Sequence, residues 1–140
     1  MRVRVRPEWI DYNGHLSEAY YVLAFGFATD ALMDRVGLDE TYRARTGCSL
    51  YTVEAHVRYL DEVGAGAELA IATTVVGAGA KKLHLCHEMA VAATVVATEE
   101  ILALHVGEGR AVPFPAEVAE RLAPLVEPPP SYAGRAITDP

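Results

Sequence analysis

Cysteine and basic residues are scarce in this chain of 140 residues. Its two cysteines, Cys48 and Cys86, lie far apart and outside any Cys-x-x-Cys pair, so we expect two reduced structural thiols. Only 12 lysines and arginines stand against 19 acidic residues, which gives a net charge of −7. The basic residues are scattered, and a phosphate backbone needs a basic footprint, so we expect no nucleic acid partner.

Long apolar runs are also absent. Residues 1–6 alternate arginine with valine and lack the apolar core of a signal peptide, and no later segment is typical of a membrane span. We therefore expect a cytoplasmic protein that does not associate with a membrane. A hydrophobic content of 51% suits one compact domain at this length. We expect that domain over residues 1–126 and a Pro-rich, mobile tail over residues 127–140.

A dense polar motif stands directly before an apolar segment. A carboxylate, an amide and an imidazole occur within the five residues Asp11-Tyr12-Asn13-Gly14-His15. Ser17 is a good N-cap residue for a helix that continues to Val36, and Gly37 can take the left-handed conformation at its end. Residues 19–29 carry no charge, so this helix is expected to be buried on most of its surface.

Alternating segments after the helix predict an antiparallel sheet. After a short first strand around Val3 and Val5, the ranges are 50–60, 68–76, 81–91 and 94–106. In the first of the long strands the odd positions, from Tyr51 to Tyr59, are expected to face the core. Thr98-Glu99-Glu100 suggests a bulge or an exposed stretch, 39–46 a short helical turn or loop, and 116–126 an amphipathic helix. Because the sheet has one helix-covered face and a long strand at its edge, we expect a homodimer, with a tetramer of paired dimers as an alternative.

The string Asp-x-Asn-Gly-His-x-x-x-x-Tyr, from Asp11 to Tyr20, resembles the hot-dog fold acyl-CoA thioesterases of the 4-hydroxybenzoyl-CoA thioesterase type. Three segments, 7–15, 28–32 and 51–60, are similar to the betainyl-CoA thioesterases of carnitine breakdown, including the domain that can follow an L-carnitine dehydrogenase. The resemblance, over residues 2–108, implies an α+β fold in which a curved five-stranded antiparallel sheet wraps a long central helix, with a short C-terminal helix. It implies hydrolysis of a small acyl-CoA without a cofactor.

The same resemblance assigns catalytic roles. In the family, the carboxylate at the position of Asp11 attacks the thioester carbonyl or activates a water, whereas the residue alone also suits an Asx turn. The developing oxyanion needs fixed donors, and by position the backbone amide of Glu18 supplies one. The commoner family string has Asn-Asn where this chain has Ser17-Glu18, so the Glu18 carboxylate offers a negative charge for a cationic acyl group instead. His15 either orients Asp11 or a water, or is structural.

The candidate substrate-binding residues come from the motif and from the long strand. Asn13 suits a left-handed turn position and shapes the loop. Several aromatic residues offer faces to a trimethylammonium group, with core packing as the alternative: Trp9, Tyr12, Tyr20, Tyr21 and Tyr51. On the strand, the candidates are the polar residues Glu54, His56 and Arg58. Glu54 and His56 either reach a site across a dimer or form an exposed polar pair, and Arg58 either meets the phosphates of coenzyme A or is solvated.

Other chemistries fit the sequence less well. We expect no metal, because His84-x-x-His87 would place the two rings on opposite faces of a strand. A Gly-x-Ser-x-Gly elbow is missing, which disfavours a Ser-His-Asp hydrolase. A hot-dog hydratase would carry an Asp-x-Asn-Pro-x-His string, whereas His15 comes four residues after Asp11 here. A non-catalytic acyl-CoA-binding module remains a third alternative, in which Asp11 is dispensable.

Overall fold

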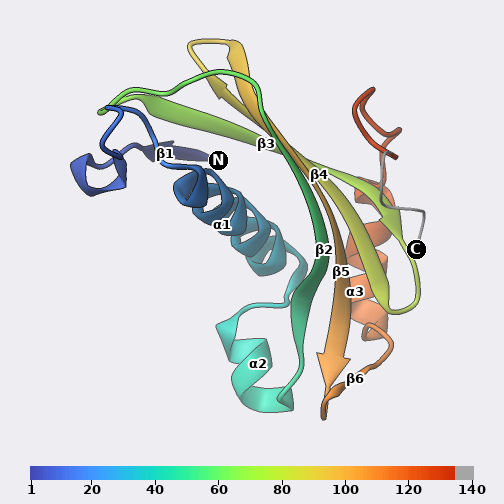
Figure 1. Cartoon of the computed structure of the whole chain (residues 1–140). Helices are drawn as coiled ribbons and strands as arrows, with labels where there is room; N and C mark the ends of the chain where they lie inside the picture. The colour runs from blue at the N-terminus through green and yellow to red at the C-terminus, as the bar shows by residue number, and fades with distance from the viewer. Residues whose placement is uncertain (135–140) are drawn as a thin grey trace.

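A computed structural model describes residues 1–134 of the chain as one curved antiparallel sheet with a long helix across its concave side (Figure 1). The helices are α1 (Glu18–Val36), α2 (Glu40–Thr46) and α3 (Ala116–Leu122), with 3-10 turns η1 (Pro7–Trp9) and η2 (Ala123–Leu125). The strands are β1 (Arg2–Arg4), β2 (Ser49–Tyr59), β3 (Glu68–Ala78), β4 (Lys82–Val91), β5 (Thr94–Gly107) and β6 (Arg110–Ala111). The order β1-β3-β4-β5-β2 confirms the predicted five-stranded sheet, which the two-residue strand β6 extends beside β5.

Helix α1 has the predicted ends but not the predicted cap. Gly37 takes the left-handed conformation (φ 87°) after its last turn. Ser17 has the extended backbone of an N-cap residue, yet its hydroxyl makes no capping hydrogen bond. The first turn is closed by the backbone instead, because the Tyr20 amide donates to the Ser17 carbonyl at 2.9 Å.

One side of α1 is buried and the other is not. Ala24, Phe25 and Ala28 are almost completely buried against the sheet. Val22, Leu23 and Phe27 remain 44%, 40% and 36% exposed, so the prediction that most of the helix surface is buried is wrong for this single chain. The physical reason is that one sheet can cover only one side of a helix.

Strand β2 carries a bulge that the sequence pattern concealed. Its pairing with β5 shifts register between Thr52 and Glu54, which interrupts the alternation of faces at Val53. Tyr51 and Val53 are 45% and 52% exposed, so the prediction that the odd positions face the core is wrong there. Only after the bulge does an odd position, Val57, pack against the core. The strand also lies at the edge of the sheet, paired on one side with β5.

The acidic centre of β5 is buried, not exposed. Thr98, Glu99 and Glu100 are 4%, 5% and 1% exposed, and their pairing with β4 and β2 is regular. The prediction of a bulge or exposed stretch here is therefore wrong. Strand β5 lies between two neighbours and is covered on both faces, which no local composition reveals.

The chain after β6 returns to the sheet. The predicted C-terminal helix is confirmed as α3, and the Arg121 guanidinium donates to the Val36 carbonyl at the end of α1 (3.1 Å). Val126 then pairs in parallel with Val75 on β3, and the Tyr132 hydroxyl donates to the His87 carbonyl at 3.1 Å. Residues 127–134 of the predicted tail thus contact the sheet, and 135–140 lie outside the described residues. None of the helices described is long and apolar enough to cross a membrane.

Candidate active site

The motif before α1 forms a tight loop closed by its own backbone. The Asp11 amide donates to the His15 carbonyl at 2.9 Å, and the Gly14 amide donates to the Asp11 carbonyl at 3.0 Å. The Asp11 Oδ1 accepts a hydrogen bond from the Asn13 amide at 2.8 Å, so the Asx turn is present. The left-handed residue of the turn is Gly14 (φ 85°), and the prediction that Asn13 takes this conformation is wrong, because the glycine accepts it without a Cβ clash.

Two hydrogen bonds fix this loop against the start of α1. The Leu16 amide donates to the Val63 carbonyl at 2.7 Å, and the Ser17 amide donates to the Trp9 carbonyl at 3.0 Å. The Leu16 side chain is 4% exposed in the core beneath the loop. The half-buried Asp11 and the first helical residue, Glu18, are thereby held at the same cleft.

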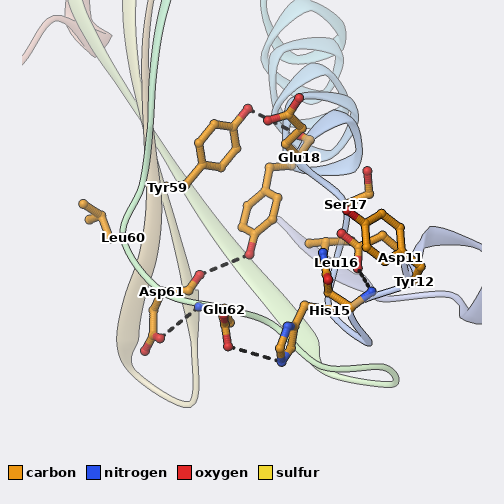
Figure 2. A pocket seen from close by; sticks show the side chains of 12 residues that line it. Asp11, Tyr12, His15, Leu16, Ser17, Glu18, Tyr59, Leu60, Asp61 and Glu62 are labelled. Atoms are coloured by element: carbon orange, nitrogen blue, oxygen red, sulfur yellow. Dashed lines mark hydrogen bonds and ion pairs between the residues drawn. The ribbon is translucent and has the colours of Figure 1, made fainter.

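We call this cleft the helix-entry cleft; it is open to solvent and has a volume of about 840 Å³ (Figure 2). Two segments line it: the motif with the first turn of α1, and the end of β2 with the turn that follows. Its residues are Asp11, Tyr12, Asn13, His15, Leu16, Ser17, Glu18, Tyr21, Tyr59, Leu60, Asp61 and Glu62. Five of the predicted site residues therefore come together in one cleft.

The second wall was missed by the sequence analysis. The Tyr59 hydroxyl donates to the Glu18 carbonyl at 3.4 Å, and the Tyr21 hydroxyl donates to the Asp61 carbonyl at 3.1 Å. The two rings meet edge to face, with centroids 5.2 Å apart. The signal available in the sequence was the pair of acids that directly follows the long strand, Asp61-Glu62.

The helix-entry cleft is acidic. Four carboxylates line it, those of Asp11, Glu18, Asp61 and Glu62, and no lysine or arginine among residues 1–134 lines it. The only basic side chain of the lining is His15, whose Nε2 lies 3.2 Å from the Glu62 Oε2 (Figure 2). This pair is well exposed, so its contribution to stability is small.

Two tyrosines of the cleft, Tyr21 and Tyr59, have raised pKa values. Burial raises the pKa of Tyr21, and the neighbouring carboxylates of Asp61 and Glu62 raise it further. Burial likewise raises the pKa of Tyr59, with a contribution from Glu18. Both phenols are therefore neutral donors at physiological pH.

The other predicted binding residues do not line the cleft. Trp9 is 4% exposed, stacks on Tyr20 with centroids 5.4 Å apart, and lies beneath the Arg6 guanidinium. This supports the core-packing alternative for both rings. On β2, the predicted residues Glu54, His56 and Arg58 pair with Leu102, Glu100 and Thr98 of β5 and lie outside the helix-entry cleft of their own chain.

The sequence profile of the thioesterase-like superfamily matches residues 5–122. The chain belongs to this family. The thioesterase is 42% identical to a betainyl-CoA thioesterase of Pseudomonas aeruginosa, over 95% of this chain and 89% of that protein.

A second relative is longer. The thioesterase is 39% identical to an L-carnitine dehydrogenase/betainyl-CoA thioesterase of Rhizobium meliloti over 89% of this chain, a match that spans 26% of that protein. Among solved structures, one of a putative thioesterase of Pseudomonas putida KT2440 has 39% identity and a TM-score of 0.84, with 100% of this chain and 95% of that chain covered. These findings confirm the hot-dog fold and the predicted class of activity, an acyl-CoA thioesterase.

Proposed function

We propose that this thioesterase hydrolyses betainyl-CoA to betaine and coenzyme A. The observation that carries the proposal is the composition of the helix-entry cleft, in which four carboxylates and three tyrosines meet and to which the described part of the chain contributes no lysine or arginine. Such a lining attracts a cation and repels an anionic acyl group. The Pseudomonas aeruginosa relative with 42% identity is a betainyl-CoA thioesterase, which supports the same substrate.

A quaternary ammonium group fits this lining in two ways. It cannot donate a hydrogen bond, so it is recognised by charge and by aromatic faces. Tyr21 and Tyr59 supply the rings, and Glu18, Asp61 and Glu62 supply the negative charge around them. The proposal keeps the predicted role of Tyr21 and replaces Trp9 and Tyr20, which pack on each other, with Tyr59.

In the proposed reaction Asp11 acts on the thioester. Its carboxylate takes a proton from water while the water oxygen attacks the carbonyl carbon, or it attacks that carbon itself and forms an anhydride that water then cleaves. In either route the C–S bond breaks, the thiolate leaves as coenzyme A and takes up a proton, and betaine is released. The first amides of α1, at Glu18 and Ala19, supply donors for the oxyanion at the positive end of the helix dipole.

We propose a homodimer, and the apolar surface beside the cleft supports it. Large apolar residues are exposed on α1, on β2 and directly after β2: Val22, Leu23, Phe27, Tyr51, Val53, Tyr59 and Leu60. The same β2 has a free edge in the single chain. A second copy bound along that edge would cover these residues, border the cleft at Tyr59 and bring basic groups such as Arg58 toward the phosphates of coenzyme A.

We propose that the protein is located in the cytoplasm. Cys48 and Cys86 are both free thiols, which is typical of a reducing compartment.

The test compares betainyl-CoA with tert-butylacetyl-CoA, in which a carbon replaces the quaternary nitrogen at nearly the same size. We expect kcat/KM to be at least ~10-fold higher for betainyl-CoA, which corresponds to about 1.4 kcal/mol of charge and cation–π stabilisation. Hydrolysis of both substrates at equal rates would contradict the proposed cation subsite, whereas the acyl-CoA thioesterase activity would still hold. Hydrolysis of neither would overturn the proposed function.

A further inference from the structure

Three side chains of the kinds that bind metal ions in proteins lie together on the face of the sheet that points away from α1. His87 of β4 faces the helix, because its ring stacks on Phe25 and its Nε2 lies 3.0 Å from the Thr29 hydroxyl. Neighbouring residues of a strand point to opposite faces, so Cys86 faces the other way, as does His84 two residues earlier. Glu100 of β5 stands directly opposite Cys86 in the sheet register.

The cluster is compact and buried. His84, Cys86 and Glu100 are 2%, 1% and 1% exposed, and one ligand atom from each lies within 4.8 Å of the others. The His84 Nε2 is 2.8 Å from the Glu100 Oε1, close to the separation of two ligands on one ion. Small side-chain movements would bring nitrogen, sulfur and oxygen to about 2.0–2.3 Å from a common centre.

A separate observation points to a missing ligand. The Glu100 Oε1 accepts a hydrogen bond from the Gly134 amide at 2.7 Å and lies 2.8 Å from the His84 Nε2. The Glu100 Oε2 is fully buried, and residues 1–134 offer it no hydrogen-bond partner. A buried carboxylate oxygen without a partner is costly, and a cation in the cluster would remove that cost.

We propose that His84, Cys86 and Glu100 form a binding site for a single transition-metal ion, with Zn²⁺ as the preferred ion. Imidazole, thiolate and carboxylate are the three ligand types that zinc takes in proteins, and the soft thiolate disfavours Mg²⁺ and Ca²⁺. The negative charges of the Cys86 thiolate and the Glu100 carboxylate balance the ion, so the loaded cluster adds no net charge to the interior. Binding releases the thiol proton to solvent.

The position of the site indicates a structural role. The C-terminal segment closes over the cluster, since Gly134 bonds Glu100 and the Tyr132 hydroxyl bonds the His87 carbonyl. The helix-entry cleft, at the start of α1, shares no residue with it. The ion would therefore join β4, β5 and the segment 127–134 and raise stability without touching the thioester. This inference is independent of the proposed function.

The spacing of possible metal ligands along the chain, His84-x-x-His87, does not reveal this proposed site. That spacing does place the two histidines on opposite faces, as expected. The ligands are instead two residues apart on one strand, at His84 and Cys86, with the third on the neighbouring strand.

The test measures Co²⁺ binding to full-length protein that has been stripped of metal with a chelator and refolded with Co²⁺. We expect one ion per chain and a near-ultraviolet charge-transfer band from thiolate to Co²⁺, which Zn²⁺ abolishes by displacement. Zinc at a hundredfold excess over its dissociation constant should raise the melting temperature by on the order of 10 °C. Folded wild-type protein that binds no Co²⁺, or binds it without the thiolate band, would overturn the proposal.

The variants identify the ligand. Cys86→Ser keeps the size of the side chain but should abolish the charge-transfer band and weaken metal binding by on the order of a hundredfold or more. Even the loss of a residue that only hydrogen-bonds to a ligand lowers metal affinity about 10- to 100-fold. Cys48→Ser, at the partly exposed second cysteine, is the matched control and should retain both. A band that survives Cys86→Ser but disappears in Cys48→Ser would contradict the assignment. If Cys86→Ser does not fold, Glu100→Gln tests the same site through its affinity.

Discussion

The ring of Tyr59 meets the ring of Tyr21 edge to face at 5.2 Å, and thereby joins the end of β2 to the first turn of α1 across the helix-entry cleft. The Tyr59 hydroxyl reaches the Glu18 carbonyl at the same point. Residues 41 positions apart in the chain thus form one wall of the proposed cation subsite. Substitutions of Tyr59 can therefore test the aromatic ring and the hydroxyl separately.

We predict that Tyr59→Leu lowers the preference for betainyl-CoA over tert-butylacetyl-CoA by roughly 3- to 30-fold, the range expected for loss of one cation–π contact. Tyr59→Phe keeps the ring and should retain the preference, although its hydrogen bond to Glu18 is lost. The measurement is kcat/KM for both substrates in each variant. An equal loss of preference in the two variants would show that the hydroxyl, not the ring, is responsible.

We predict that Asp11→Asn lowers kcat by roughly 10²- to 10⁴-fold, because the amide cannot take a proton or attack the carbonyl. The amide oxygen can still accept the hydrogen bond from the Asn13 backbone, so the loop should keep its shape. Thiol release from betainyl-CoA measures the loss, and circular dichroism checks the fold. Glu8→Gln, at an exposed acid in η1, is the control and should retain activity. Substantial turnover in Asp11→Asn would remove Asp11 from its proposed role.

Stability should depend on pH through Glu99. Burial raises the pKa of this carboxyl to about 7 from the ordinary 4.5. The folded protein therefore binds the proton more tightly than the unfolded chain, and stability falls as the pH rises from about 4.5 to about 7. We predict that Glu99→Gln raises the free energy of unfolding by about 2 to 3 kcal/mol at pH 8 and changes it little at pH 4.5.

Urea denaturation of wild type and variant at both pH values measures this difference. The comparison at each pH cancels the titration of groups distant from Glu99. His87 stands directly opposite Glu99 in the sheet, but burial lowers its pKa to about 4, so it is mostly neutral at both pH values. Glu120→Gln, at an exposed acid of α3, is the control and should show no such pH dependence. A Glu99→Gln effect of the same size at pH 4.5 and pH 8 would contradict the assignment.

Association should depend on the edge of the sheet. We predict that Val53→Glu, at the exposed bulge of β2, converts the homodimer to monomers, because a buried, unpaired charge opposes pairing at that edge. Sedimentation velocity measures the mass, and activity should fall with it. Ala72→Glu, at an exposed position of β3, is the control and should remain dimeric. A wild-type protein that sediments as a monomer would contradict the proposed homodimer.

Local sequence patterns were sufficient to predict the elements that depend on interactions between residues close together in the chain. The end of α1 at Gly37 and the strands β3, β4 and β5 follow from capping and alternation, and the structure confirms each. For 39–46 the sequence left a short helical turn or a loop open, and the structure has the helix α2. The same reasoning was wrong at Val53 and at Glu99–Glu100. A bulge shifts register through pairing with another strand, and the burial of an acidic pair depends on what covers it.

The sequence by itself determined the motif Asp11–His15, the helix that follows it and the antiparallel strands, because neighbouring residues fix turns, caps and the periodicity of each element. Only the tertiary structure decided what stands opposite that motif. Tyr59, Asp61 and Glu62 reach the helix-entry cleft, and Glu100 reaches Cys86, through strand pairing over long sequence separations. Such contacts depend on the register of the whole sheet, which no local pattern contains.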